Sequence, residues 1–356
     1  MEMRIALLGC GNVGTRLIKL LAAKDEALRR EHDLAITISG AFTRRAGGWT
    51  APAGLAPAVV AASGWPEGAP GERQAPEGAQ PFSGDGVSFA ASCPADLLVE
   101  ITTLNPADGQ PALDHARAAL RAGKHVATAN KGPIAHGLRE LRALAAARGL
   151  GLRFESTVMD GTPIINMMEF SLPVTEVISF RGLLNSTSNY VLSLMSGGMT
   201  LEDAVREAQR AGVAEADPSN DLDGWDASVK ATVLANALMG ADLRPQDVRR
   251  IGLGADAMRA AIAARQPDQT IKQVVEGRRE AGGVIAEVKL LALPPSDTLA
   301  HLTGMETAVR LVTDTMGELT LIEGEGDPTQ TAMGVLSDIV NIARAHPQAG
   351  GEESRP

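Results

Sequence analysis

Residues 3–14 read M-R-I-A-L-L-G-C-G-N-V-G, and this stretch decides the fold of the first half of the chain. The apolar run over 3–8 stops at a glycine, which predicts a short buried β-strand. Residues 15–24 follow with helical periodicity. A strand, a G-x-G-x-x-G turn and a helix in this order are typical of a dinucleotide-binding unit, in which the glycines let the backbone approach the pyrophosphate. The residues predicted to bind the cofactor here are Gly9, Gly11, Asn12, Val13 and Gly14.

Residues 34–155 alternate between short apolar strands and amphipathic helices. This alternation predicts an α/β fold with a Rossmann-type, doubly wound parallel sheet. Strands are expected at 34–42, 95–102, 123–129 and 151–155, and helices at 110–122 and 137–148. Ligands of such sheets bind at the carboxyl ends of the strands. Four polar residues occupy these ends and are predicted to contact the cofactor: Thr102, Thr103, Asn130 and Lys131.

The end of the second strand predicts which nicotinamide cofactor is bound. A site that prefers NAD carries an acid there, which holds the ribose diol. Thr43, Arg44 and Arg45 stand at this position instead. Because arginine pairs well with phosphate, Arg44 and Arg45 favour NADP and leave NAD open. The alternative is that both are ordinary surface arginines.

Residues 46–92 are rich in alanine, glycine and proline and show little periodicity. Prolines spread between positions 52 and 81 exclude a long helix from most of this segment. We therefore expect a surface excursion with one short helix at 56–62, and we assign no chemistry to it.

The pattern changes after residue 175. A strand at 177–184 precedes the polar run N-S-T-S-N at 185–189, and a helix capped by Thr200 stops at Gly212. Helical segments are expected up to about residue 280. They are followed by antiparallel strands at 284–293, 307–314 and 318–323 and by a closing helix at 332–344. The expected organisation is a nucleotide-binding domain at 1–153 with 332–346, an α+β substrate-binding and dimerisation domain at 154–331, and a disordered tail at 347–356.

Residues 214–230, A-E-A-D-P-S-N-D-L-D-G-W-D-A-S-V-K, combine five acids with one closing lysine. Pro218 and Gly224 interrupt regular structure, and a helix follows. Asp226 suits the first turn of this helix, where a carboxylate meets free N–H groups, and Lys230 lies four residues on, on the same face. A solvated acidic loop is the alternative interpretation. A lysine in the middle of an Ala/Val/Leu-rich helix favours a charged cleft instead.

The length of 356 residues suits two domains, and the net charge of −10 argues against binding to nucleic acid or to an anionic membrane. With Cys10 and Cys93 as the only cysteines, neither a disulfide framework nor a cysteine metal site is expected. Neither a signal peptide nor an apolar run of membrane-spanning length is evident. We expect a cytoplasmic protein that acts on a small molecule.

The acidic stretch resembles the motif E-A-D-P-x-x-D-x-x-G-x-D-A-x-x-K of homoserine dehydrogenases, with matching spacing over 215–230. The resemblance extends to G-x-G-x-x-G at 9–14, A-N-K at 129–131, F-E-x-x-V at 154–158 and S-D-I-V at 337–340. It covers nearly the whole chain, and the order and spacing of several motifs make it far more specific than any one of them. The C-terminal regulatory module of longer family members is not found, so the chain is similar to the short form.

The resemblance implies an NAD(P)-dependent interconversion of aspartate 4-semialdehyde and homoserine, a step of threonine and methionine biosynthesis. Hydride would move between the aldehyde carbon and C4 of the nicotinamide. Lys230 would stabilise and protonate the alkoxide, with Asp226 orienting it and Lys131 sharing the charge. An amine in a partly desolvated cleft suits this role, because burial lowers the pKa of an ammonium group. Glu215 and Asp221 would bind the substrate ammonium.

Two further features concern assembly and ions. The antiparallel strands of the second domain predict a homodimer joined through its sheet. The resemblance also implies a structural monovalent cation, Na⁺ or K⁺, held by the Glu155 carboxylate and by the carbonyls of Val158, Asp160 and Thr162.

Three segments depart from the family pattern. Ser186 replaces a glycine in N-S-T-S-N, Met159 and Asp160 replace small residues in the cation turn, and G-E-G-D-P at 324–328 replaces G-P-G-A-G. Two alternatives therefore stay open: a non-catalytic nucleotide-binding relative, and a related oxidoreductase for another small amino-aldehyde or hydroxy acid. A phosphorylating semialdehyde dehydrogenase would need a thiolate, for which Cys10 and Cys93 are poorly placed.

Overall fold

The computed structural model describes residues 1–66 and 75–346. The chain forms two compact units, Met1–Gly161 with Asp327–Pro356, and Thr162–Gly326. This division places residues 154–161 and 327–331 in the first unit, whereas the sequence analysis assigned them to the second domain. The tail predicted to be disordered, 347–356, lies outside the described residues. No helix in the described part of the chain is both long and apolar enough to cross a bilayer.

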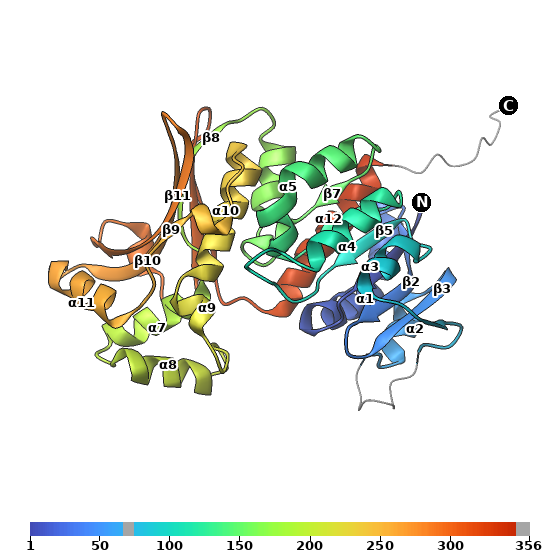
Figure 1. Cartoon of the computed structure of the whole chain (residues 1–356), viewed down its shortest axis with the longest axis horizontal. Helices are drawn as coiled ribbons and strands as arrows, with labels where there is room; N and C mark the ends of the chain where they lie inside the picture. The colour runs from blue at the N-terminus through green and yellow to red at the C-terminus, as the bar shows by residue number, and fades with distance from the viewer. Residues whose placement is uncertain (67–74, 347–356) are drawn as a thin grey trace. The chain divides into compact units, whose positions relative to one another are not determined.

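The first unit is built on a seven-stranded sheet with the order β4-β3-β2-β1-β5-β6-β7. Its strands β2, β3, β5 and β7 are labelled in Figure 1. Its strands are β1 Glu2–Leu8, β2 Ala35–Thr43, β3 Gly47–Leu55, β4 Gln80–Phe82, β5 Leu97–Glu100, β6 His125–Thr128 and β7 Leu152–Arg153. Strands β2, β1, β5, β6 and β7 are parallel, and β3 and β4 add an antiparallel edge. The predicted α/β fold with a parallel sheet is confirmed.

Helices cover both faces of this sheet. Alternate residues of β1 point to opposite faces, and the side chains on each face are apolar and pack against helices. Ile5 and Leu7 pack in the cluster that contains α1 and α12, whereas Ala6 and Leu8 pack in the cluster of α3, α4 and α5. All four side chains are almost fully buried, as a central parallel strand requires. The helices of this unit are α1 Asn12–His32, α2 Pro57–Ala62, α3 Gly86–Ser92, α4 Ala112–Arg121, α5 Lys131–Ala146 and α12 Pro328–Ala345.

The expectation of a surface excursion with a single helix at 46–92 is wrong. Besides α2, the segment contains strands β3 and β4 and helix α3, and Trp49 is fully buried in the core. Strand β3 tolerates Pro52 because the pairing with β2 skips from Thr50 to Leu55, which places the proline in a bulge. The prolines therefore mark an irregular edge of the sheet and do not exclude strands.

The second unit contains a six-stranded sheet with the order β13-β12-β8-β10-β11-β9. Its strands are β8 Val177–Leu183, β9 Arg249–Arg250, β10 Thr270–Glu280, β11 Gly283–Leu293, β12 Thr307–Thr313 and β13 Gly317–Glu323. All neighbours are antiparallel except β9 and β11. The helices expected up to residue 280 end earlier, because 270–280 form the strand β10. Both faces of β10 are buried over 271–275, so the alternation typical of a half-exposed strand is missing there.

The longer helices of the second unit are α7 Ser186–Ser196, α8 Leu201–Arg210, α10 Trp225–Met239 and α11 Ala255–Ala264. Helix α10 packs along β8, β10 and β11 and is buried on most of its surface. Helix α7 begins at Ser186, inside the polar run 185–189, because the Asn185 side chain caps it by accepting from the Ser188 N–H at 2.7 Å. Asn185 thus stands where a strand passes directly into a helix.

Candidate active site

The glycine turn between β1 and α1 is shaped by two close backbone approaches. Gly9 has φ +101°, and a Cβ there would lie 2.5 Å from the Ile101 carbonyl oxygen, just beyond β5. A Cβ on Gly14 would lie 2.7 Å from the Gly9 carbonyl oxygen. Only glycine satisfies both positions, so these two residues are required by the turn itself.

Gly11 is different, because a Cβ at this residue would meet nothing within 4 Å. Gly11 precedes Asn12 and Val13 in the first turn of α1, and no side chain in the described residues caps this helix end. The start of α1 therefore lies beside open space and has no side-chain cap. This arrangement fits the pyrophosphate of a dinucleotide, which accepts hydrogen bonds from a helix N-terminus.

Arg44 and Arg45 lie in the turn between β2 and β3, and both are exposed. Within residues 1–66 and 75–346, neither guanidinium has a hydrogen-bond or ion-pair partner. The turn runs from Thr43 to Ala46 and contains no acidic residue. Two unpaired cations at the end of the second strand suit an anionic group.

The loops after β5 and β6 are joined through Asn130. Its Nδ2 donates to the Thr102 carbonyl at 3.1 Å, and its Oδ1 accepts from the Gly132 N–H at 2.9 Å and so caps α5. Thr103 follows on the same loop, and Lys131 is the half-buried first residue of α5. The structure thus brings together the four polar residues predicted at these strand ends.

The acidic stretch folds into a short helix, α9 Ser219–Leu222, and the start of α10. Gly224 has φ +78° and turns the chain between them. Asp226 lies in the first turn of α10, and its Oδ2 is 3.2 Å from the Nζ of Lys230, one helical turn later. Each of the two side chains is 15% exposed. The Lys230 ammonium also donates to the Leu184 carbonyl at the end of β8.

Asn185 completes this cluster, and the sequence analysis did not identify it as a site residue. Its Nδ2 donates to Asp221 Oδ1 at 2.7 Å and to Asp226 Oδ2 at 3.0 Å. Burial raises the pKa of the Asp221 carboxyl above its usual range, and the charge of Asp226 raises it further. A cation beside the two carboxylates, such as the Lys230 ammonium or a cationic ligand, relieves the repulsion between Asp221 and Asp226. The acidic cluster is defined as Asn185, Asp221, Asp226 and Lys230.

Glu215 does not join the acidic cluster in this structure. Its side chain is exposed and has no hydrogen bond or ion pair within the described residues, and only its carbonyl accepts, from Gln209 Nε2 at 3.2 Å. Asp217 is also exposed, and its carboxylate accepts from the Ser219 N–H at 3.1 Å. Glu215 remains a predicted substrate-binding residue.

Asn189, the last residue of the N-S-T-S-N run, forms a buried hydrogen bond with Lys272. Asn189 accepts from the Nζ of Lys272 at 2.8 Å, and this ammonium also donates to the Leu302 carbonyl. Lys272 is 1% exposed on β10, and burial lowers its pKa to about 8. This lysine fixes the first turn of α7, which begins directly after Asn185.

The predicted cation turn lies at the end of the first unit. Glu155 is 1% exposed, and its N–H donates to Asp338 Oδ2 at 2.9 Å. Val158 is buried, and Asp160 has φ +33° and accepts from Thr331 Oγ1 at 2.8 Å. Thr162 is the first residue of the second unit. No cluster of three or more His, Cys, Asp or Glu able to hold a metal occurs among the residues that the structure describes.

Both cysteines are buried thiols. Burial raises the pKa of Cys10 to about 12 and that of Cys93 to about 12. A thiol with such a pKa is protonated at neutral pH and is a poor nucleophile. The structure therefore offers no support for chemistry through a cysteine thiolate.

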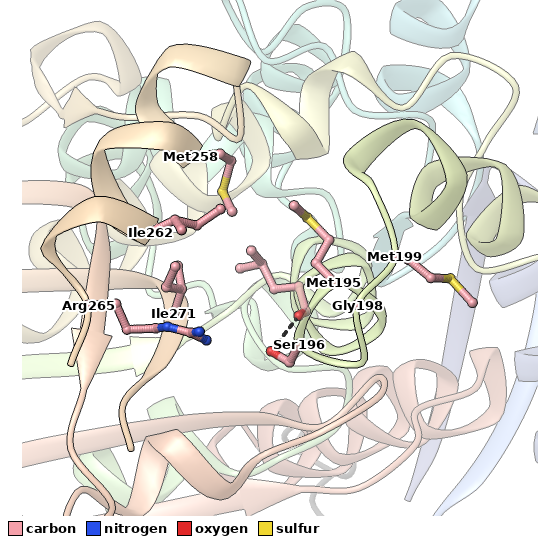
Figure 2. A pocket seen from close by; sticks show the side chains of 9 residues that line it. Met195, Ser196, Gly198, Met199, Met258, Ile262, Arg265 and Ile271 are labelled. Carbon is pink, nitrogen blue, oxygen red and sulfur yellow. Dashed lines mark hydrogen bonds between the residues drawn. The ribbon is translucent and has the colours of Figure 1, made fainter. Parts of the chain in front are cut away.

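A separate apolar cavity of about 190 Å³ lies in the second unit, and Figure 2 shows its lining. Methionine, leucine and isoleucine side chains from α7, α11 and β10 form most of the wall, and Arg265 is the single charged residue among those that line it. Ser196 faces its own helix and donates to the Leu192 carbonyl at 2.9 Å. None of the acidic cluster lines this cavity, which therefore does not suit a small zwitterionic substrate.

Family models match the chain in two segments that correspond closely to its two compact units. The family model described as homoserine dehydrogenase matches residues 163–340, and that of the homoserine dehydrogenase NAD-binding domain matches residues 9–155. An NAD(+)-dependent homoserine dehydrogenase of Pseudomonas canavaninivorans is 35% identical over 342 residues, which cover 96% of each chain. A homoserine dehydrogenase of Sulfurisphaera tokodaii is 32% identical, over 96% of this chain and 99% of the relative.

Solved structures agree with these matches. A hyperthermophilic archaeal homoserine dehydrogenase in complex with NADPH superposes with a TM-score of 0.80 and 26% identity, over 98% of this chain and 99% of that chain. The enzyme of Thermoplasma acidophilum gives a TM-score of 0.79 and 26% identity, over 97% of this chain and 100% of that chain. Family models and near full-length relatives thus meet on the same two units. The chain belongs to the homoserine dehydrogenase family.

Proposed function

We propose that this protein catalyses the NAD(P)-dependent interconversion of homoserine and aspartate 4-semialdehyde. The observation that carries the proposal is the acidic cluster, in which one partly buried amine stands among two carboxylates and an amide. The substrate has an α-ammonium, which needs carboxylates, and a hydroxyl, which needs a proton acceptor when it becomes an aldehyde. The cluster offers both kinds of group.

In the oxidation of homoserine, the bond that breaks is a C–H bond at the carbon that bears the hydroxyl. NAD(P), when bound, takes up the hydride from this carbon. Lys230 in its neutral amine form accepts the hydroxyl proton and becomes an ammonium, and in the reverse direction that ammonium returns the proton to the oxygen that develops negative charge. Asp226 keeps the amine on the correct face of α10 through their 3.2 Å contact.

The substrate ammonium is assigned to the carboxylates of the acidic cluster, chiefly Asp221. The raised pKa of this residue has its origin in burial beside Asp226, so a cation placed there stabilises the ionised form. Glu215 is proposed as a further carboxylate for the same ammonium. Lys131, at the start of α5, is proposed to share the stabilisation of the oxygen charge.

A direct assay tests the proposal against its alternatives. Purified protein is mixed with homoserine and with either NAD⁺ or NADP⁺, and nicotinamide reduction is followed by absorbance. We expect turnover with at least one of the two cofactors. Cofactor binding without turnover would favour a non-catalytic relative, and turnover only with another amino-alcohol or hydroxy acid would favour a different substrate.

NADP is the proposed preferred cofactor, supported by the two exposed arginines at the end of β2. We expect Arg44→Ala to weaken NADPH binding by about tenfold and NADH binding far less, since an ionic contact to a phosphate contributes roughly 1–2 kcal/mol. Dissociation constants from fluorescence titration measure this difference. Arg30→Ala, an exposed arginine at the far end of α1, serves as the control. Equal losses for the two cofactors would refute the 2′-phosphate contact.

The proposed homodimer is supported by a charged row across one face of the second unit's sheet. Arg310, Arg181, Glu276 and Glu287 stand opposite one another on β12, β8, β10 and β11. Arg181 Nε donates to Glu276 Oε1 at 3.0 Å, and on the same face Ile322 of β13 is 52% exposed. Sedimentation equilibrium is expected to give twice the 37.0 kDa chain mass, and a monomer mass would contradict the dimer.

Three further proposals follow from the family membership. A monovalent cation, Na⁺ or K⁺, is assigned to Glu155 and the carbonyls of Val158, Asp160 and Thr162. A cytoplasmic location is consistent with two cysteines that are free thiols in the structure. The proposed metabolic role of the protein is to supply homoserine for the biosynthesis of threonine and methionine.

A further inference from the structure

A carboxylate with no exposed surface lies beneath the predicted cofactor loops. Glu100 is the last residue of β5 and is 0% exposed. Its Oε1 accepts from the Thr102 N–H at 3.3 Å and from the Thr102 hydroxyl, and it lies 3.3 Å from His115 Nδ1. Its Oε2 accepts from the Thr128 hydroxyl at 3.4 Å. None of the roles assigned so far uses this residue.

The groups around Glu100 close a ring of hydrogen bonds. Thr128 Oγ1, at the end of β6, accepts from the Asn130 N–H at 3.0 Å. The Asn130 side chain then donates back to the Thr102 carbonyl at 3.1 Å and to its hydroxyl at 3.3 Å. The ring therefore joins the loop that follows β5 to the loop that starts α5. Both loops carry residues predicted to contact the nicotinamide cofactor.

Because Glu100 is fully buried, its carboxyl oxygens need hydrogen-bond donors from the protein. Burying a polar group without hydrogen-bond partners costs several kcal/mol of folding free energy. The hydrogen bonds to Glu100 therefore fix the positions of both the carboxyl group and its donors. An apolar residue would fill the same space without directing any neighbour. The donors of Glu100 include the backbone and side chain of Thr102, which means that the carboxylate sets the path of the loop and not merely its packing.

The same loop also touches the glycine turn. The Ile101 carbonyl, between Glu100 and Thr102, is the atom that a Cβ on Gly9 would meet at 2.5 Å. A displaced loop would therefore disturb both the redox end and the pyrophosphate end of the predicted cofactor site. His115 reaches the carboxylate from α4, and Gly86 leaves room for its ring, since a Cβ there would lie 2.5 Å from Nε2.

We infer that Glu100 is a positioning residue for the nicotinamide cofactor: through Thr102, Thr128 and Asn130 it holds the β5 and β6 loops in the conformation that binds NAD(P). This inference rests on the proposed function for the identity of the ligand. It does not depend on turnover, because both the loop conformation and cofactor affinity are measured without substrate.

The test replaces the carboxylate by its neutral isostere, Glu100→Gln, which exchanges one acceptor oxygen for an amide donor. We expect the dissociation constant for the preferred reduced cofactor to rise about tenfold, as the loss of a buried hydrogen bond predicts. Amide hydrogen exchange of the cofactor-free protein is expected to speed up in residues 101–104 and 130–132, with other segments unchanged. Thr128→Val, which removes a hydroxyl without changing shape, should shift both readouts in the same direction.

Asp96→Asn is the matched control. Asp96 precedes the same strand at its opposite end, where its Oδ2 accepts from the Arg4 N–H at 2.9 Å. This variant is expected to bind the cofactor like the parent protein. Unchanged affinity and exchange in Glu100→Gln would overturn the inference, as would an equal loss in Asp96→Asn. If Glu100→Gln does not fold, Thr128→Val decides by the same criteria. Loss of affinity in a protein that fails to oxidise homoserine would leave this inference standing and refute only the proposed substrate.

Discussion

Replacing Lys230 by methionine is expected to lower kcat for homoserine oxidation by roughly a thousandfold, the usual contribution of a positioned acid–base group. Methionine keeps the apolar stem within α10 and removes only the amine that stands 3.2 Å from Asp226. Without it, the hydroxyl proton has no acceptor in homoserine oxidation, and in the reverse direction the developing oxygen charge has no ammonium beside it. Steady-state kinetics at saturating substrate and cofactor measure the effect.

The cofactor affinity of Lys230→Met separates chemistry from folding. Since Lys230 belongs to the second unit and the glycine turn to the first, the dissociation constant for NADPH is expected to stay within about twofold of the parent value. Lys24→Met, at an exposed position of α1, serves as the control for turnover. Near-normal kcat in Lys230→Met would remove this residue from the proposed mechanism.

The second large effect is expected from Gly11→Ala. A Cβ at this position meets no protein atom within 4 Å, so the free energy of unfolding should change by less than about 1 kcal/mol. The methyl group would instead occupy the space that the pyrophosphate approaches, and the affinity for the preferred cofactor should fall by roughly tenfold to a hundredfold. Thermal unfolding and cofactor titration measure the two quantities on one preparation.

Gly9→Ala provides the contrast within the same turn. Its φ of +101° and the 2.5 Å approach to the Ile101 carbonyl oxygen make any Cβ a clash with backbone. We expect a loss of roughly 3 kcal/mol in the free energy of unfolding, the range of backbone strain combined with overpacking. If Gly11→Ala bound the cofactor like the parent protein, the pyrophosphate would not lie at this turn.

Local patterns were sufficient for the parts of the site that are close in sequence. The glycine turn is contained in six residues, and the spacing of four between Asp226 and Lys230 places both on one helix face. The link from Asn185 to Asp221 spans 36 positions and depends on how β8 and α7 meet the acidic stretch. No periodicity in the sequence encodes such a contact, so Asn185 was recognised only as part of a polar run.

The strands and contacts that the sequence analysis did not predict also depend on contacts between distant parts of the chain. Strand β3 is interrupted by Pro52 in a bulge, and β10 is buried on both faces, so neither shows clean alternation. Glu100 is the last residue of an otherwise apolar strand, and its hydrogen bonds to Thr128 and His115 come from other elements. The family departure at 324–328 also has a structural explanation, because Asp327 caps α12 and Pro328 is its first residue.

The transfer of deuterium from homoserine labelled at the carbon that bears its hydroxyl tests the central claim most directly. Protein is incubated with this substrate and the oxidised cofactor, and the reduced nicotinamide is analysed by mass spectrometry and NMR. The account predicts deuterium at C4 of the nicotinamide in the parent protein and almost none formed by Lys230→Met. Reduced cofactor without deuterium, or equal transfer by the variant, would contradict it.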